Sequence, residues 1–161
     1  MKHICTFLAT GCYSGYLPIA PGTWGTLVAM PLFWLLGSLS PFVYLVTLVG
    51  FIFLSIWAAD YGSVKFERED PPQVVIDEIA GYLVTMAFFK PSLVIMIIGF
   101  FMFRLFDITK PQPVAWCEKK FSGGTGIVLD DVMAGIYANL AIHLLIFIDT
   151  YFKINLLTSY L

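Results

Sequence analysis

The sequence predicts an all-α protein that lies in a membrane as a single domain, residues 1–161, built as a polytopic bundle of about five apolar helices. Two observations predict this fold class. Hydrophobic residues make up 59% of the chain and charged residues only 12%, whereas ordinary soluble domains have about 25% charged residues. Long apolar stretches also alternate with short polar breaks. Because backbone polar groups in lipid must be satisfied within the chain, each apolar stretch is expected to be a helix.

Five apolar segments are expected to form these helices: residues 24–36, 42–59, 74–89, 93–106 and 127–152. The turns between them are rich in Gly, Ser and Pro, as in residues 37–41 and 90–92, and such residues punctuate helices. The second segment is long enough, at about 1.5 Å per residue, to cross most of a hydrocarbon core of roughly 30 Å. Residues 60–73 and 109–126 are expected to be polar loops.

The charges predict how these helices are oriented. If the five helices cross back and forth, every acidic residue except Asp149 lies on one face of the membrane. Most of the nine Lys and Arg residues lie on that face too, namely Lys2, Lys65, Arg68, Arg104, Lys110, Lys119 and Lys120. Only Lys90 and Lys153 lie opposite. Because basic residues concentrate on the cytoplasmic side of membrane proteins, the acidic face is expected to be cytoplasmic.

Several kinds of partner and site are disfavoured by composition. The net charge of -2 gives no reason to expect a nucleic acid partner. The three cysteines, Cys5, Cys12 and Cys117, are odd in number and lack the spacing of a zinc site or a disulfide framework. They are expected to be packing residues. The expected partners are therefore lipids, and the oligomeric state is left open.

Carboxylates at three expected helix ends predict a metal site. They are Asp77 and Glu78, Asp107, and Asp130 and Asp131. Gathered near the membrane surface, these groups would repel one another unless cations were present, and hard oxygen ligands select Mg²⁺, Mn²⁺ or Ca²⁺. A structural alternative exists for each: acids favour helix N-terminal turns, and Asp107 is spaced for an ion pair with Arg104 one turn earlier. Convergence of all five favours function.

Neighbouring residues on the same face suit a phosphate group. Gly22 and Thr23 open the first expected helix, where free N–H groups and the helix dipole attract anions. Arg104 and Lys110 bracket Asp107 and could clamp phosphate oxygens. Carboxylates for metal and donors for phosphate together predict metal-assisted phosphoryl chemistry.

Four motifs in this chain resemble those of the phosphatidylglycerophosphatase A family. They are SGYLPIAPGTWG at residues 14–25, VIDEIAG at 75–81, FRLFDITKPQP at 103–113 and GGTGIVLDDVMAG at 123–135. The resemblance implies a Mg²⁺-dependent enzyme of the bacterial inner membrane. Such an enzyme removes the terminal phosphate of phosphatidylglycerophosphate to give phosphatidylglycerol.

The expected site assigns a role to each of these residues. The residues Asp77, Glu78, Asp107, Asp130 and Asp131 would hold one or two Mg²⁺ ions, and Asp77, Asp107 and Asp131 are the expected catalytic groups. The phosphate would lie against Gly22, Thr23, Arg104 and Lys110. The nucleophile is water or an aspartate, and Asp70 is a further candidate ligand. The alternative function is a small cation or proton carrier that uses the same carboxylates as a relay.

Overall fold

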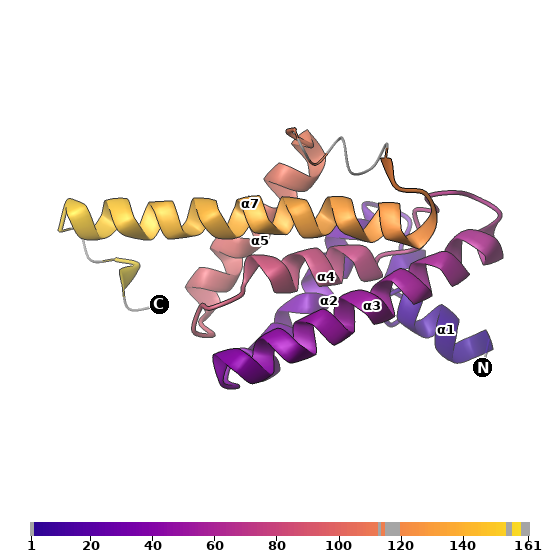
Figure 1. The fold of residues 1–161 in the computed structure, drawn as a ribbon, viewed down its shortest axis with the longest axis horizontal. Coiled ribbons are helices and arrows are strands. Elements are labelled where there is room, and N and C mark those ends of the chain that lie inside the picture. The colour runs from indigo at the N-terminus through magenta and orange to yellow at the C-terminus, as the bar shows by residue number, and fades with distance from the viewer. Residues whose placement is uncertain (1, 113, 115–119, 154–155, 159–161) are drawn as a thin grey trace.

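The structure, a computed structural model, describes residues 2–112, 114, 120–153 and 156–158. Within them the chain forms six α-helices and a short 3-10 helix, so the all-α prediction is confirmed (Figure 1). The elements are α1 (Lys2–Ala9), η1 (Ser14–Tyr16), α2 (Pro21–Leu36), α3 (Pro41–Phe66), α4 (Ile76–Thr85), α5 (Leu93–Thr109) and α7 (Gly123–Tyr151).

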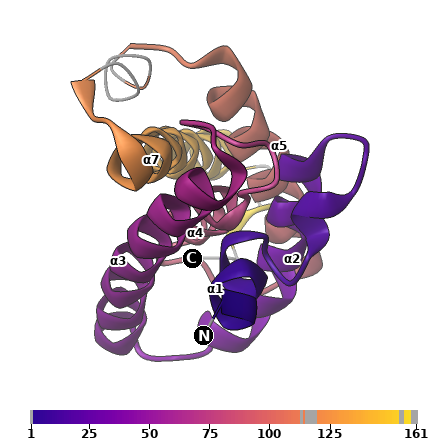
Figure 2. The same ribbon diagram turned by 90° about the vertical axis from the view of Figure 1, so that its right-hand side faces the viewer.

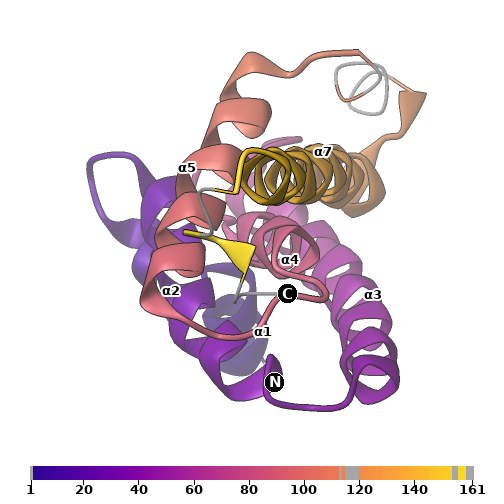
Figure 3. The same ribbon diagram turned by 90° about the vertical axis from the view of Figure 1, so that its left-hand side faces the viewer.

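The short helix α4 lies at the centre of the bundle. It packs against α2, α3, α5 and α7, and the end-on views of Figures 2 and 3 show it enclosed by these four helices. All but one of its ten residues are buried. A helix that is surrounded by other helices is apolar around its whole circumference. Residues 74–89 therefore have the composition of one long apolar segment, although α4 occupies only ten of them.

Two of the described helices are long and apolar enough to cross a membrane, α3 with 26 residues and α7 with 29. At about 1.5 Å per residue they extend roughly 39 and 44 Å, more than a hydrocarbon core of roughly 30 Å. By the same measure α4 extends only about 15 Å and is too short to span a membrane.

The structure differs from the expected elements at two further places. Residues 2–9 form α1, which no apolar segment predicted and which packs against α3. Helix α3 continues to Phe66, so the loop expected from residue 60 begins seven residues later. Tertiary packing extends it, because Ala58, Ala59 and Gly62 are buried on this helix and small residues allow close helix contacts.

Close packing between helices fixes how α4 and α7 cross. A Cβ atom at Gly135 of α7 would collide with the carbonyl oxygen of Gly81 in α4. A Cβ at Gly81 would lie 2.7 Å from the carbonyl oxygen of Asp131. These two glycines therefore let the backbones touch. Their contact brings the first turn of α4 and the third turn of α7, which carry the acidic pairs, to the same end of the bundle.

A tertiary cap fixes the start of α7. Gly123 has φ +67°, in the left-handed region that favours glycine. The carboxylate Oδ1 of Asp60, on α3, accepts a hydrogen bond of 2.5 Å from the backbone N–H of Gly124. A cap of this kind satisfies an otherwise unpaired N–H group and complements the helix dipole. Asp60 thereby ties the start of α7, and the acids two turns further on, to α3.

Candidate metal and phosphate site

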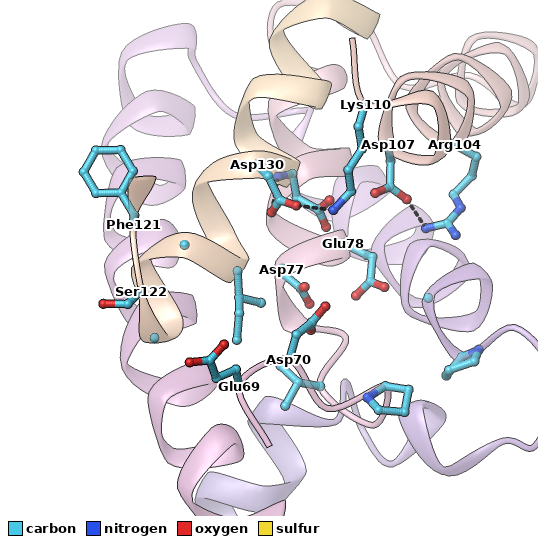
Figure 4. Close-up of a pocket in the computed structure, with 18 of the residues that line it drawn as sticks. Glu69, Asp70, Asp77, Glu78, Arg104, Asp107, Lys110, Phe121, Ser122 and Asp130 are labelled. Atoms are coloured by element: carbon cyan, nitrogen blue, oxygen red, sulfur yellow. Dashed lines mark hydrogen bonds and ion pairs between the residues drawn. The ribbon is translucent and has the colours of Figure 1, made fainter. Parts of the chain in front are cut away.

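A cavity of about 660 Å³ opens at the end of the bundle where these helix ends meet. The first turns of α2, α4 and α7 line it, together with the last turns of α5 and the loop between α3 and α4. Its charged lining consists of Glu69, Asp70, Asp77, Glu78, Arg104, Asp107, Lys110, Lys120, Asp130 and Asp131. Figure 4 shows most of these side chains directed toward a common centre. The cavity therefore brings together all five predicted metal ligands.

Three of the five carboxylates form the tightest group. Asp77, Glu78 and Asp131 each offer an oxygen, and these oxygens lie within 4.8 Å of one another. Asp77 Oδ1, Glu78 Oε2 and Asp131 Oδ2 are buried and have no hydrogen-bond partner among the described residues. Leaving a buried carboxylate oxygen unpaired is costly. Three such oxygens aimed at one point form a set of hard donors that fits a divalent cation such as Mg²⁺.

Electrostatics at α4 support the same interpretation. Burial, followed by the charge of Glu78, raises the pKa of Asp77 well above its ordinary value. Burial also raises the pKa of Glu78 to about 8, although its hydrogen bond with Asp77 opposes the shift. Both shifts have the same physical cause, because a charged carboxylate is poorly solvated inside the bundle. The raised pKa values favour the protonated forms of Asp77 and Glu78 when no cation is bound, so a metal and protons compete for them.

The other two predicted ligands are engaged with basic side chains. Arg104 Nη1 lies 2.7 Å from Asp107 Oδ2, the i, i+3 ion pair that the sequence offered as an alternative. Lys110 Nζ donates to Asp130 Oδ2 at 2.8 Å, and Asp130 Oδ1 accepts from the backbone N–H of Asp131 at 2.9 Å (Figure 4). Both oxygens of Asp130 are thus in use. The five carboxylates divide into three that converge and two that hold cationic groups at the rim.

The predicted phosphate-binding residues are only partly brought together. Gly22, Arg104 and Lys110 line the cavity, whereas Thr23 does not. The backbone N–H of Thr23 already donates to Ala20 O at 2.9 Å. A Cβ atom at Gly22 would collide with Glu78 Oε1 and would lie 3.1 Å from Arg104 Nη1. Gly22 is therefore required for the close approach of α2 to the charged groups.

Loop residues also line the cavity, and the sequence analysis either gave them little weight or did not name them. Asp70 lines the cavity and raises the pKa of Asp77 through its charge, and Figure 4 places it next to Asp77 and Glu78. Glu69 lies beside it on the same loop, and Phe121 and Ser122 close the opposite wall. No spacing rule marks these loop residues. The eight-residue spacing between the acidic pairs 69–70 and 77–78 is the one signal that the sequence offers.

The polar residues at the other end of the bundle serve the fold. The Asn139 side-chain amide donates to the carbonyl oxygens of Thr85 and Ala87, both at 2.9 Å, and so caps the C-terminal end of α4. The ring of His143 stacks on Phe89, with ring centroids 4.5 Å apart, and its Nδ1 lies 3.0 Å from Asn139 O. Asn139 therefore links α7 to the end of α4, whereas the polar contact of His143 stays within α7.

Comparison with known proteins gives consistent matches over most of the chain. The model of the family described as phosphatidylglycerophosphatase A matches residues 7–146. A Bacteroides thetaiotaomicron protein, provisionally named a phosphatidylinositol-3-phosphatase, is 39% identical over 142 residues, which cover 81% of this chain and 86% of that protein. The phosphatidylglycerophosphatase A of Escherichia coli is 35% identical over 139 residues, covering 84% of this chain and 80% of its own.

The protein of the same name from Haemophilus influenzae is 35% identical over 134 residues, which cover 81% of this chain and 82% of that protein. No solved structure matches the chain. The matched range includes all four sequence motifs and every residue of the cavity wall. The family model thus matches the whole part of the chain that builds the site.

Proposed function

Because the chain belongs to the phosphatidylglycerophosphatase A family, we propose that it hydrolyses the terminal phosphate of phosphatidylglycerophosphate, giving phosphatidylglycerol and inorganic phosphate. The family makes the chain a lipid phosphatase. The finer choice of substrate follows the two relatives named phosphatidylglycerophosphatase A. The Bacteroides relative carries the name of a different lipid phosphatase. The assay must therefore compare phosphatidylglycerophosphate with a phosphoinositide.

The observation that carries the proposal is the convergence of three buried carboxylates with unpartnered oxygens. Asp77, Glu78 and Asp131 supply the donors that Mg²⁺ prefers. We assign them as the ligand set. When bound, Mg²⁺ would polarise the phosphoryl group and lower the pKa of water. Asp77 and Asp131 therefore keep the catalytic role that the sequence suggested.

The rim of the cavity is proposed to bind the phosphate. Arg104 presents a guanidinium whose fork geometry matches phosphate oxygens, and Asp107 orients it. Lys110, held by Asp130, adds a second positive charge. The first turn of α2 at Gly22 lies directly against Glu78 and Arg104. Arg104 and Lys110 stand beside the carboxylates, so a phosphomonoester bound to them has its phosphorus close to the three converging acids.

We also propose that the whole chain is one membrane-embedded domain in the bacterial inner membrane, with the site at the cytoplasmic face. The two candidate spans support this, as does the large number of exposed apolar side chains along the helices, such as Phe42, Phe53 and Phe147. Apolar surface of that extent needs lipid to cover it. Helix α5 packs against the candidate span α7, helix α2 packs against α4 and α5, and α4 lies inside the bundle.

The carrier alternative is disfavoured by where the acids lie. A proton or cation relay requires titratable groups along the membrane path. The described acids gather at one end of the bundle, apart from Asp149, whose two carboxylate oxygens accept from the backbone N–H groups of Leu156 and Leu157 at 3.1 and 2.8 Å. Asn139 and His143 in between are hydrogen-bonded to backbone oxygens. None of these groups offers a path across the bundle.

Phosphate release from the purified protein in detergent tests the proposed function. We expect release from phosphatidylglycerophosphate with Mg²⁺, no release after EDTA treatment, and recovery when Mg²⁺ is restored, because the proposed chemistry needs a divalent cation held by the three carboxylates. Phosphatidylinositol 3-phosphate is assayed in parallel at the same mole fraction. Full turnover in chelator would refute the metal assignment, and faster release from the phosphoinositide would replace the proposed substrate.

The proposed orientation is tested with cysteines in a background that lacks the three native ones. A cysteine at Glu67, which is exposed at the end of α3, should resist an impermeant thiol reagent on intact spheroplasts and react in inverted vesicles. A cysteine at Ser38, at the opposite end of the bundle, should do the reverse. Labelling of both positions from one side would contradict a membrane crossing by α3.

A further inference from the structure

The segment of residues 13–19, which leads into the cavity wall, exposes an unusual amount of apolar surface. Its side chains Tyr13, Tyr16, Leu17 and Ile19 are all exposed, and Ile19 has 77% of its surface accessible. The backbone beneath them is held in place. Gly15 is buried, and a Cβ atom there would collide with the carbonyl oxygen of Gln73. The segment therefore lies flat on the loop before α4 and turns its apolar side chains outward.

Both ends of this segment are fixed by unusual backbone conformations. Cys12 precedes it with φ +58°, its first residue Tyr13 has φ +67°, and Ala20 follows it with φ +49°. Left-handed conformations are unfavourable for residues other than glycine and persist only where surrounding structure imposes them. The indole Nε1 of Trp24 donates to Ile19 O at 3.0 Å and secures the last residue. The apolar side chains are thus presented by a rigid segment.

The same segment is continuous with the phosphate end of the cavity. Ala20, Pro21 and Gly22, which directly follow Ile19, line the cavity, and Gly22 contacts Glu78 and Arg104. On its other side, Tyr16 packs edge-on against Phe66 with ring centroids 6.1 Å apart. Tyrosine and tryptophan side chains concentrate where a membrane meets water, because one end of each ring is apolar and the other is polar.

From this geometry we propose that residues 13–19 form a lipid-contact segment, which holds the glycerol backbone and the upper acyl chains of the substrate while its phosphate lies in the cavity. This inference rests on the proposed function and names the part of the protein that recognises the lipid portion of the substrate. A phosphate bound next to Arg104 has its remaining atoms directed out of the cavity. The nearest continuation of the cavity wall at α2 is the apolar surface of Leu17 and Ile19.

The test compares serine substitutions in this segment with matched substitutions elsewhere. Ile19→Ser is paired with Val64→Ser, because Val64 is also β-branched, is 81% exposed and lies at the same end of the bundle without lining the cavity. Leu17→Ser is paired with Leu39→Ser, since the two leucines are 40% and 41% exposed. Phosphatidylglycerophosphate turnover is measured in detergent micelles at varied lipid mole fraction. Elution of each variant from gel filtration as the wild type confirms that it is folded.

We expect Ile19→Ser and Leu17→Ser to raise KM by about fivefold each, which corresponds to the loss of part of one buried apolar side chain. Their kcat should stay near the wild-type value, because the lost contact is the same in the ground state and the transition state. Val64→Ser and Leu39→Ser should leave both constants unchanged. An unchanged KM in both segment variants, or an equal rise in the controls, would overturn the inference. A wild-type protein that releases no phosphate would instead refute the proposed function.

Discussion

The two ends of the helix bundle treat their polar groups in opposite ways. At the far end, Asn139 donates to two carbonyl oxygens and Asp149 accepts from two backbone N–H groups. At the cavity end, Asp77, Glu78 and Asp131 keep buried oxygens without a hydrogen-bond partner among the described residues. Buried polar groups are nearly always paired when their role is structural. The unpaired oxygens therefore support the cavity end as the proposed functional site.

Left-handed backbone conformations are also more numerous at the cavity end than at the far end. Glycines allow close approach at the cavity end, where Gly22 lies against Glu78 and Gly124 against Asp60. Of the left-handed residues other than glycine, Cys12, Tyr13, Ala20, Glu67 and Lys110 lie near the cavity or on segments leading to it, whereas Phe88 and Lys153 lie at the far end. Strained conformations tend to accumulate at functional sites. The cavity end thus carries both the unpaired charges and most of the strain.

The largest effect is expected from removing one charge of the converging group. Asp131→Asn should lower kcat by about a thousandfold, because a neutral amide is a poor Mg²⁺ ligand and the acid is expected to act in the chemical step. The matched change at the far end, Asp149→Asn, should lower kcat less than about twofold, since it keeps an oxygen that can accept a hydrogen bond. Initial rates at saturating lipid measure both. An equal loss of kcat in Asp131→Asn and Asp149→Asn would contradict the assignment of the cavity end as the functional end.

A smaller effect is expected at the rim. Arg104→Lys should raise KM by about tenfold, because lysine supplies the charge but not the planar fork that can engage both Asp107 and a phosphate. Arg68→Lys is the matched control, as Arg68 is exposed at the same end and does not line the cavity. Steady-state kinetics on the lipid substrate separate KM from kcat. A wild-type KM in Arg104→Lys would remove this residue from phosphate binding.

Mg²⁺ should bind more tightly at high pH than at low pH, because Glu78 on α4 must lose its proton before it can hold the metal. The pKa of Glu78 is raised to about 8, so this group holds its proton below that pH and a metal must displace it. Mg²⁺ should therefore raise the Tm more at pH 8.5 than at pH 6.5. Thermal unfolding in detergent, with and without Mg²⁺, measures the difference. The Asp131→Asn variant serves as the control and should show little rise at either pH, whereas an equal rise at both values would contradict proton competition.

The acidic residues of the site could be predicted from the sequence because carboxylates are rare in apolar segments, and their position at segment ends places them on one face. The proposed chemistry of Asp77, Asp107 and Asp131 rests on that placement together with the resemblance of the motifs. What could not be predicted is how the charges pair. The contact between Lys110 and Asp130 and the cap of α7 by Asp60 depend on side chains that only the tertiary structure brings together.

Helix lengths show the same limit. Residues 74–89 have the composition of a membrane span, yet α4 has only ten residues because Asn139, more than fifty residues later, caps its end. Composition reports burial but cannot tell burial in lipid from burial in protein. The start of α1 and the end of α3 were missed for a related reason. Each is stabilised by packing against the other, which composition along the chain does not report.

The smallest effect on activity is expected at the end of α4. Asn139→Ala removes two hydrogen bonds to buried carbonyl oxygens and should lower the free energy of unfolding by about 1–3 kcal/mol. The kcat should nevertheless stay within about twofold of wild type, because Asp77 and Glu78 lie at the opposite end of α4 and are held there by Gly22 and α7.

Thermal unfolding and phosphate release, measured on the same preparation, separate the two outcomes for Asn139. Asn139→Asp is the informative comparison, because the carboxylate has nearly the same shape but cannot donate when ionised. It should destabilise the protein at least as much as alanine does. If instead Asn139→Ala kept the wild-type stability but lost most of its activity, a polar group far from the cavity would be functional. The contrast between the two ends would then fail, and a relay through the bundle would have to be reconsidered.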